Sequence, residues 1–244
     1  MTSLRDDLTS SVASRIRSSF TPGDNEWTDC HQTKSGGFDP LERLSKLRLL
    51  FYPEMGVTLG RRPMEVESQA VSAEWATFRE NVRWTQSDVH YATIHIVGSK
   101  NGTTDFVGRT EAHDAAVLER TRAGIEWLRF AFDRAKADSA RGLFITIHAN
   151  PGIDRKEIPE AYRTFLAALQ EETSRFEGPV VLAHGDSHYF IIDKPLRHPE
   201  TNKRLTNFTR VETFGSSDVH WIEVTVDPES KNVFSFDQRI VEVE

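Results

Sequence analysis

Two short apolar runs, each preceded by a longer segment with helical periodicity, constrain the fold of this chain more than any other feature. The runs G-L-F-I-T-I-H (142–148) and P-V-V-L-A-H (179–184) are typical of strands that are buried on both faces. The apolar residues of segments 111–137 and 158–173 recur with the spacing of helices. Buried strands that alternate with helices pair in parallel, so the sequence predicts an α/β fold.

The remaining segments predict a helical start and a strand-rich end for a single domain over residues 1–244. An amphipathic helix is expected first, because apolar residues recur every four positions at Leu4, Leu8, Val12 and Ile16. A second helix is expected from Pro40 to Tyr52, with the proline near its start. Segment 53–88 shows a mixed pattern. Further strands are expected at 91–97, before a turn at 98–102, and in the tail at 189–193, 220–226 and 232–241.

The composition and charge of the chain argue against several classes of protein. Of its 244 residues, 38% are hydrophobic and 27% are charged, a balance typical of globular proteins. The formal net charge of −7 argues against a protein that mainly holds nucleic-acid backbone. No apolar run approaches the roughly 20 residues that span a bilayer, and the N-terminus lacks the pattern of a secretory signal. One cysteine allows no internal disulfide, so we expect a cytoplasmic protein without nucleic-acid or membrane partners. The oligomeric state stays open.

Polar side chains gather in segments that follow, or could follow, strands. The segment T-P-G-D-N-E-W-T-D-C-H (21–31) combines carboxylate, amide, thiol and imidazole groups. His148 ends one buried run, and H-G-D-S-H (184–188) ends the other. In open α/β sheets, ligands bind beyond the carboxyl ends of the strands. Carboxylate, amide and imidazole donors together suit a divalent ion such as manganese, iron or zinc.

Each of these polar segments also has a purely structural interpretation. A histidine at a strand end is more often hydrogen-bonded than a ligand, and segment 21–31 alone fits a turn that leads into a capped helix. Their joint occurrence favours a metal site. Nucleophilic catalysis is a weaker hypothesis, because Cys30 and His31 are adjacent in sequence and no G-x-S-x-G motif is present.

The order of these segments resembles the calcineurin-like metallophosphoesterases. P-G-D-N-E-W, then His148 at a strand end, then Gly185-Asp186-Ser187-His188 correspond to the third, fourth and fifth of that family's five sequence blocks. The resemblance covers roughly residues 20–240. Within the family, the chain is similar to a divergent branch that has the motifs G-D-N-E-W and H-G-D-S-H. It implies a two-sheet sandwich flanked by helices and metal-dependent hydrolysis of a phosphoester in a phosphorylated small molecule.

The resemblance also implies roles for individual residues. The metal ligands it implies are Asn25, His148, Asp186 and His188, with Asp186 standing where the family has its first histidine of the last block. The catalytic residues it implies are His148 and Glu26, which occupies the place of the family's catalytic histidine.

The family's first two blocks, D-x-H and G-D-x-x-D, have no counterpart here, so the N-terminal strands of the fold are expected to be missing. Those blocks supply the bridging carboxylate, and without it the resemblance implies one weakly bound divalent ion instead of two tightly bound ones. The basic loop 193–210 is expected to border the pocket and to bind substrate through Arg197 and Arg204, although a solvated hairpin is an equal alternative. Two other hypotheses remain: a catalytically inactive binding module on the same fold, and an unrelated α/β domain with structural polar loops.

Overall fold

A mixed sheet of seven strands lies at the centre of the structure, a computed structural model that describes residues 17–242. The strand order is β1-β2-β3-β4-β5-β7-β6. Strands β3, β4, β5 and β7 run parallel, whereas β1, β2 and β6 pair antiparallel to their neighbours. Their bounds are β1 Glu67–Ser68, β2 Val82–Gln86, β3 Val89–Thr93, β4 Gly142–Thr146, β5 Val180–His184, β6 Ile191–Asp193 and β7 Phe208–Glu212.

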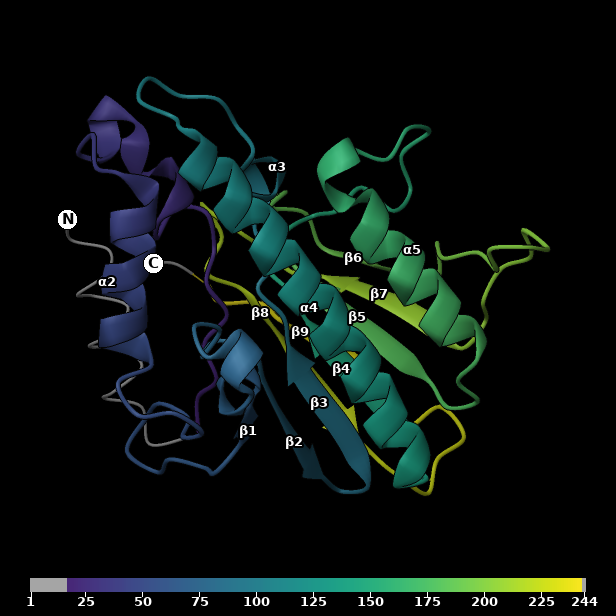
Figure 1. Cartoon of the computed structure of the whole chain (residues 1–244). Helices are drawn as coiled ribbons and strands as arrows, with labels where there is room; N and C mark the ends of the chain where they lie inside the picture. The colour runs from purple at the N-terminus through teal and green to yellow at the C-terminus, as the bar shows by residue number, and fades with distance from the viewer. Residues whose placement is uncertain (1–16, 243–244) are drawn as a thin grey trace.

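Two long helices, α4 (Glu111–Ala137) and α5 (Glu160–Ser174), lie across one face of this sheet (Figure 1). Their apolar faces and the side chains of β3, β4 and β5 form the main core. A third helix, α2 (Pro40–Phe51), lies beyond the β1 edge. Asp39 caps α2 by accepting hydrogen bonds from the backbone N–H groups of Leu41 and Glu42, as expected for a helix with proline at its first position.

An antiparallel ribbon covers the opposite face of the sheet. It consists of β8 (Trp221–Val226) and β9 (Phe234–Arg239). Phe234 packs against Val181 and Val211, which alternate with the helix-facing residues of β5 and β7. The α/β class and the helices that flank the sheet are therefore confirmed. No helix in residues 17–242 has the length and apolarity needed to cross a membrane.

The expected elements agree with the structure in most places, with differences at their ends. The helix predicted for 111–137 has those bounds, and the strand predicted for 91–97 begins and ends earlier, as β3. Strand β2 lies inside the mixed segment, and β7 takes the end of the predicted loop 193–210. Short 3-10 helices occur at Thr28–His31, Thr33–Ser35, Gln69–Val71 and Ala73–Trp75. The helix predicted around Leu8 and Val12 lies outside the described residues.

The turn after β3, α3 (Gly98–Gly102), has a left-handed backbone, with φ of 49° at Ser99 and 55° at both Lys100 and Asn101. Such angles are uncommon outside glycine and need support from the surroundings. The support comes from α4, where the buried Arg120 donates to the side-chain and main-chain oxygens of Asn101 at 2.5 and 2.6 Å. The Tyr162 hydroxyl of α5 accepts from the Asn101 N–H at 3.0 Å. The turn is therefore fixed by both long helices.

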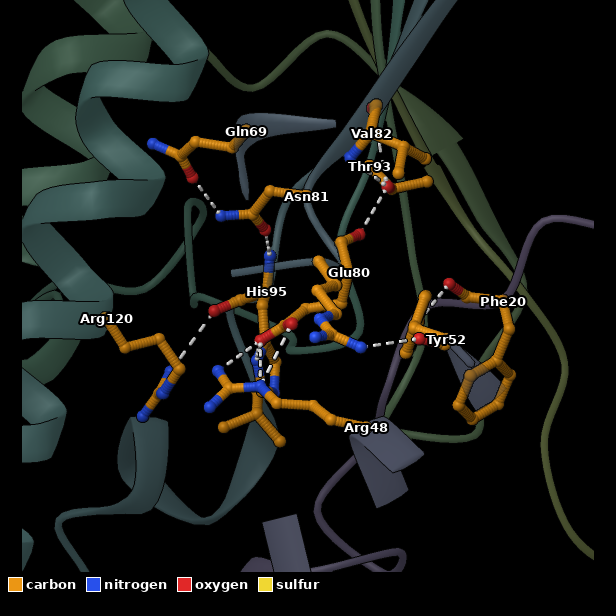
Figure 2. Close-up of polar contacts among 12 residues, drawn as sticks. Phe20, Arg48, Tyr52, Gln69, Glu80, Asn81, Val82, Thr93, His95 and Arg120 are labelled. Atoms are coloured by element: carbon orange, nitrogen blue, oxygen red, sulfur yellow. Dashed lines mark hydrogen bonds and ion pairs between the residues drawn. The ribbon is translucent and has the colours of Figure 1, made fainter. Parts of the chain in front are cut away.

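A buried polar network joins α2 to β2, β3 and α4 (Figure 2). The carboxylate of Glu80 is fully buried, and it accepts hydrogen bonds from the Arg48 guanidinium at 2.5 Å and from His95 Nδ1 at 2.8 Å. Burial alone would raise the pKa of Glu80, but the charge of Arg48 and the bond from His95 outweigh it and lower that pKa to about 2. Burial lowers the pKa of His95 to about 4. The pair is therefore a carboxylate beside a neutral imidazole at neutral pH.

Candidate metal site

Three side chains from separate parts of the chain meet beyond the carboxyl ends of β4 and β5. Asp24, His148 and Asp186 each offer one ligand atom, and these atoms all lie within 4.8 Å of one another. His148 follows β4 and Asp186 follows β5, which are adjacent parallel strands, so both residues leave the same edge of the sheet. Asp24 arrives from segment 21–31, which belongs to no strand.

The turn around Asp24 directs its carboxylate inward. The Asp24 carbonyl accepts from the backbone N–H groups of Trp27 and Asp29, at 3.2 and 3.0 Å. The Ser99 hydroxyl bridges the carboxylates of Asp24 and Asp29, with oxygen–oxygen distances of 3.1 and 2.5 Å. Trp27 is buried against the ring of His95 and beneath the guanidinium of Arg120. Segment 21–31 is thus held to the left-handed turn after β3 and to the core behind it.

His148 is oriented by a backbone hydrogen bond. The Gly98 N–H donates to His148 Nδ1 at 3.2 Å, so the neutral ring carries its own proton on Nε2. That Nε2 atom lies 3.9 Å from Asp24 Oδ1. Because a metal-bound imidazole keeps a proton on its other nitrogen, binding of an ion through Nε2 requires the Gly98 bond to open. As it stands, Nε2 can donate a hydrogen bond, and after a small rearrangement it can act as a metal ligand.

The two carboxylates of the site approach each other across Gly98. A Cβ atom on Gly98 would lie 2.3 Å from Asp24 Oδ2 and 2.7 Å from both carboxylate oxygens of Asp186. Burial raises the pKa of Asp186, and the nearby negative charge of Asp24 raises it further. Only a glycine at position 98 leaves room for both acidic groups.

Glu212, at the end of β7, joins the two strand-end loops of the site. Its side chain is fully buried, and its Oε1 atom accepts hydrogen bonds from Asn150 Nδ2 at 3.0 Å and from the Ser187 hydroxyl. Its Oε2 atom has no hydrogen-bond partner among the described residues and lies 4.0 Å from Arg210 Nη1. Burial raises the pKa of Glu212. Glu212 thereby fixes the loop after His148 relative to the turn that carries Asp186.

His188 lies outside the triad but close to it. Its Nδ1 atom is 2.8 Å from the Ser216 carbonyl, which can only accept, so Nδ1 carries the proton and Nε2 presents a lone pair. In its protonated form, His188 is near enough for its charge to lower the pKa of Asp186 against the larger effect of burial. His188 is exposed, and its ring packs on Gly215.

Asn25 and Glu26 flank the triad differently from each other. Asn25 is exposed, and the acidic side chain that reaches the triad comes from its buried neighbour, Asp24. Glu26 accepts a hydrogen bond from the Gly23 N–H at 2.7 Å. Gly23 also contacts the ring of His148, because a Cβ added there would lie 2.6 Å from His148 Nε2 and 2.7 Å from Glu26 Oε2. Glu26 and His148, which the resemblance assigns to catalysis, therefore both approach the same side of Gly23.

Arg197 and Arg204 are not part of the triad. They line a separate cavity between α5 and the hairpin that follows β6, together with Asp154 and Asp193. Sequence reasoning missed Asp24, Gly98, Ser99 and Glu212 as parts of the site. A signal existed for the turn at 98–102, which directly follows an apolar strand in the same way as His148 does.

Comparisons of the chain with family models, with curated proteins and with solved structures find no match. The interpretation of the site therefore depends on its own geometry.

Proposed function

We propose that this protein is a metal-dependent phosphoester hydrolase that binds one divalent ion through Asp24, His148 and Asp186. The convergence of two carboxylates and one imidazole from three distant segments carries the proposal. Oxygen and nitrogen ligands lie about 2.0–2.2 Å from an ion such as zinc, so two of them are at most about 4.4 Å apart. The triad is close to that size. Its donor set fits manganese, iron or zinc.

The residues around the triad have distinct roles in this proposal. The ion supplies a Lewis acid that polarises a phosphoryl oxygen. Asp24 and Asp186 hold it, and their mutual repulsion favours a cation between them. His148 would complete the ligand set through Nε2, which lies 3.9 Å from Asp24 Oδ1, once its hydrogen bond from Gly98 has opened. Hydrogen bonds of Ser99 and Glu212 hold the loops that carry the ligands in place. The metallophosphoesterase-like sandwich, with the β8–β9 ribbon as its second sheet, belongs to the same proposal.

Replacement of Asp186 by asparagine is expected to abolish both metal binding and turnover. Asparagine keeps the size of the side chain but removes one of the two charges that face the ion. Calorimetry with Mn²⁺ should give one site for the parent chain, and hydrolysis of p-nitrophenyl phosphate or bis(p-nitrophenyl) phosphate should stop in excess EDTA. Turnover that survives both EDTA and Asp186→Asn would exclude the proposal. Mn²⁺ binding without turnover of either ester would favour the inactive binding module.

A pair of glycine variants tests the geometry of the triad without changing its charge. Gly98→Ala should weaken Mn²⁺ binding roughly tenfold or more, because the added methyl group pushes the carboxylates of Asp24 and Asp186 apart. Gly185→Ala is the matched control, since a Cβ at that neighbouring position meets no atom within 4 Å. Calorimetry on both variants, with melting curves to check the fold, gives the comparison. Equal Mn²⁺ affinity in the two variants would place the ion elsewhere.

A further inference from the structure

A cavity whose lining contains none of the triad residues lies on the α5 side of the sheet. It has a volume of about 580 Å³, and it is enclosed by segment 153–158, by α5 and by the hairpin 195–204. Volumes of about 300–1,000 Å³ are typical of small-molecule sites. Apolar side chains of Ile153, Leu166 and Leu196 form part of its wall.

The charges of this cavity are unbalanced. Both acidic residues that line it, Asp154 and Asp193, form ion pairs with the buried guanidinium of Arg210, at 3.1 and 2.7 Å. The hydrogen bond from Arg210 lowers the pKa of Asp154, which keeps that carboxylate ionised and paired. Four cationic side chains also line the cavity, and none of them forms an ion pair among the residues that the structure describes: Arg155, Lys156, Arg197 and Arg204. The cavity is therefore basic in a chain whose net charge is −7.

Two of these cations are held opposite each other. Arg197 and Arg204 form an antiparallel bridge in the hairpin, so their side chains stand side by side. Each guanidinium is anchored by one hydrogen bond of 2.9 Å to a backbone carbonyl, from Arg197 to Asn202 and from Arg204 to Lys194. Neither guanidinium makes another hydrogen bond within residues 17–242, so their other N–H groups remain available. Like charges directly opposite one another are destabilising, and an anion between them removes that repulsion.

We propose that this cavity binds the phosphoryl group of a phosphorylated small molecule, at a site separate from the metal triad. Arginine suits this group because its planar N–H fork matches two phosphate oxygens, and two arginines with a second cationic pair nearby suit a dianion. The apolar wall receives the body of the ligand. The buried Arg210 pairs with Asp154 and Asp193 of the cavity and lies 4.0 Å from Glu212, which joins the two strand-end loops of the metal site. The inference does not depend on a bound ion.

Calorimetric titration with pyrophosphate, in excess EDTA and at fixed ionic strength, tests this site in the full chain. We expect one pyrophosphate per chain for the parent, and at least about tenfold weaker binding for Arg197→Gln/Arg204→Gln, since each charge-assisted hydrogen bond contributes substantially. Arg61→Gln/Arg62→Gln is the matched control, because it removes two exposed arginines from the segment that precedes β1, the strand at the edge of the sheet opposite β6. Arg155→Gln/Lys156→Gln repeats the test on a different segment of the cavity wall.

The outcomes separate this inference from the proposed function. Pyrophosphate binding that persists in Asp186→Asn but is lost in both cavity variants supports the cavity. Loss in Asp186→Asn would place the anion at the metal triad and overturn the inference. The inference is also overturned if the Arg61/Arg62 control weakens binding as much as the cavity variants do, because the effect would then be one of overall charge. An unchanged pyrophosphate affinity in Arg197→Gln/Arg204→Gln would also overturn the inference.

Discussion

Replacement of Glu80 by alanine is expected to lower the free energy of unfolding by roughly 3–5 kcal/mol, the range measured when one partner of a buried ion pair is removed. The variant leaves the charge of Arg48 and the Nδ1 proton of His95 without their acceptor in the core. Whole domains are stable by only about 5–15 kcal/mol, so the loss is a large part of the total. Urea denaturation, monitored by tryptophan fluorescence, measures this change in the free energy of unfolding.

Two controls give this result its meaning. Glu74→Ala removes an exposed carboxylate that lies 3.8 Å from Arg122, and such a surface pair contributes at most about 1 kcal/mol. The double variant Arg48→Met/Glu80→Met should recover part of the stability, because it removes both charges together. A loss below about 1 kcal/mol in Glu80→Ala would mean that the pair contributes no more than a surface contact.

Acidification from pH 7 to pH 4 is expected to destabilise the protein through His95. Its pKa is about 4 in the folded state and near 6.5 when unfolded, so the unfolded chain takes up the proton first as the pH falls. The stability that depends on the neutral ring is complete above pH 6.5 and is lost progressively down to pH 4, by on the order of 3 kcal/mol. Glu80 adds a loss of the same sign between pH 4.5 and 2, because its pKa is about 2 in the folded state.

Burial also lowers the pKa of His184 to about 4. Protonation of two histidines, His95 and His184, therefore destabilises the fold over the same pH range. Urea midpoints between pH 7.5 and 4.5 should therefore flatten partly in His95→Gln and partly in His184→Gln. His198→Gln, in the hairpin 195–204, is the control and should keep the slope of the parent chain. A parent whose midpoint is constant over this range would contradict the buried, neutral state of both rings.

The helices could be predicted from sequence because their signals are local. The 111–137 pattern has a threonine directly before it, and in the structure Thr110 forms a capping box with His113. Strand β7 was missed for the opposite reason. Its Arg210 looks like a surface or loop residue, and it is buried only because Asp154 and Asp193, distant in sequence, pair with it. A pattern of polarity along one segment cannot show such a partner.

The candidate site was predicted in part for similar reasons. His148 and Asp186 stand at the ends of two recognisable strands, and the rule for parallel sheets brings them together. The choice between Asp24 and Asn25 depends on a turn whose hydrogen bonds come from Trp27, Asp29 and Ser99. Nothing in the local sequence indicates whether Asp24 or its neighbour Asn25 faces the site. Glu212 acts through Asn150 and Ser187, and both contacts span long stretches of chain.

The site has one wall in the sheet and one wall outside it. His148 and Asp186 follow central strands, whose opening requires disruption of the core, whereas Asp24 belongs to a segment held by side-chain bonds and by the packing of Trp27. Proteins open in cooperative units of unequal stability, so a segment outside the sheet can open separately from it. An ion bound across both walls would be released at the rate at which segment 21–31 detaches, while the sheet stays folded. It would also act as a reversible cross-link that stabilises that segment in proportion to the ion concentration.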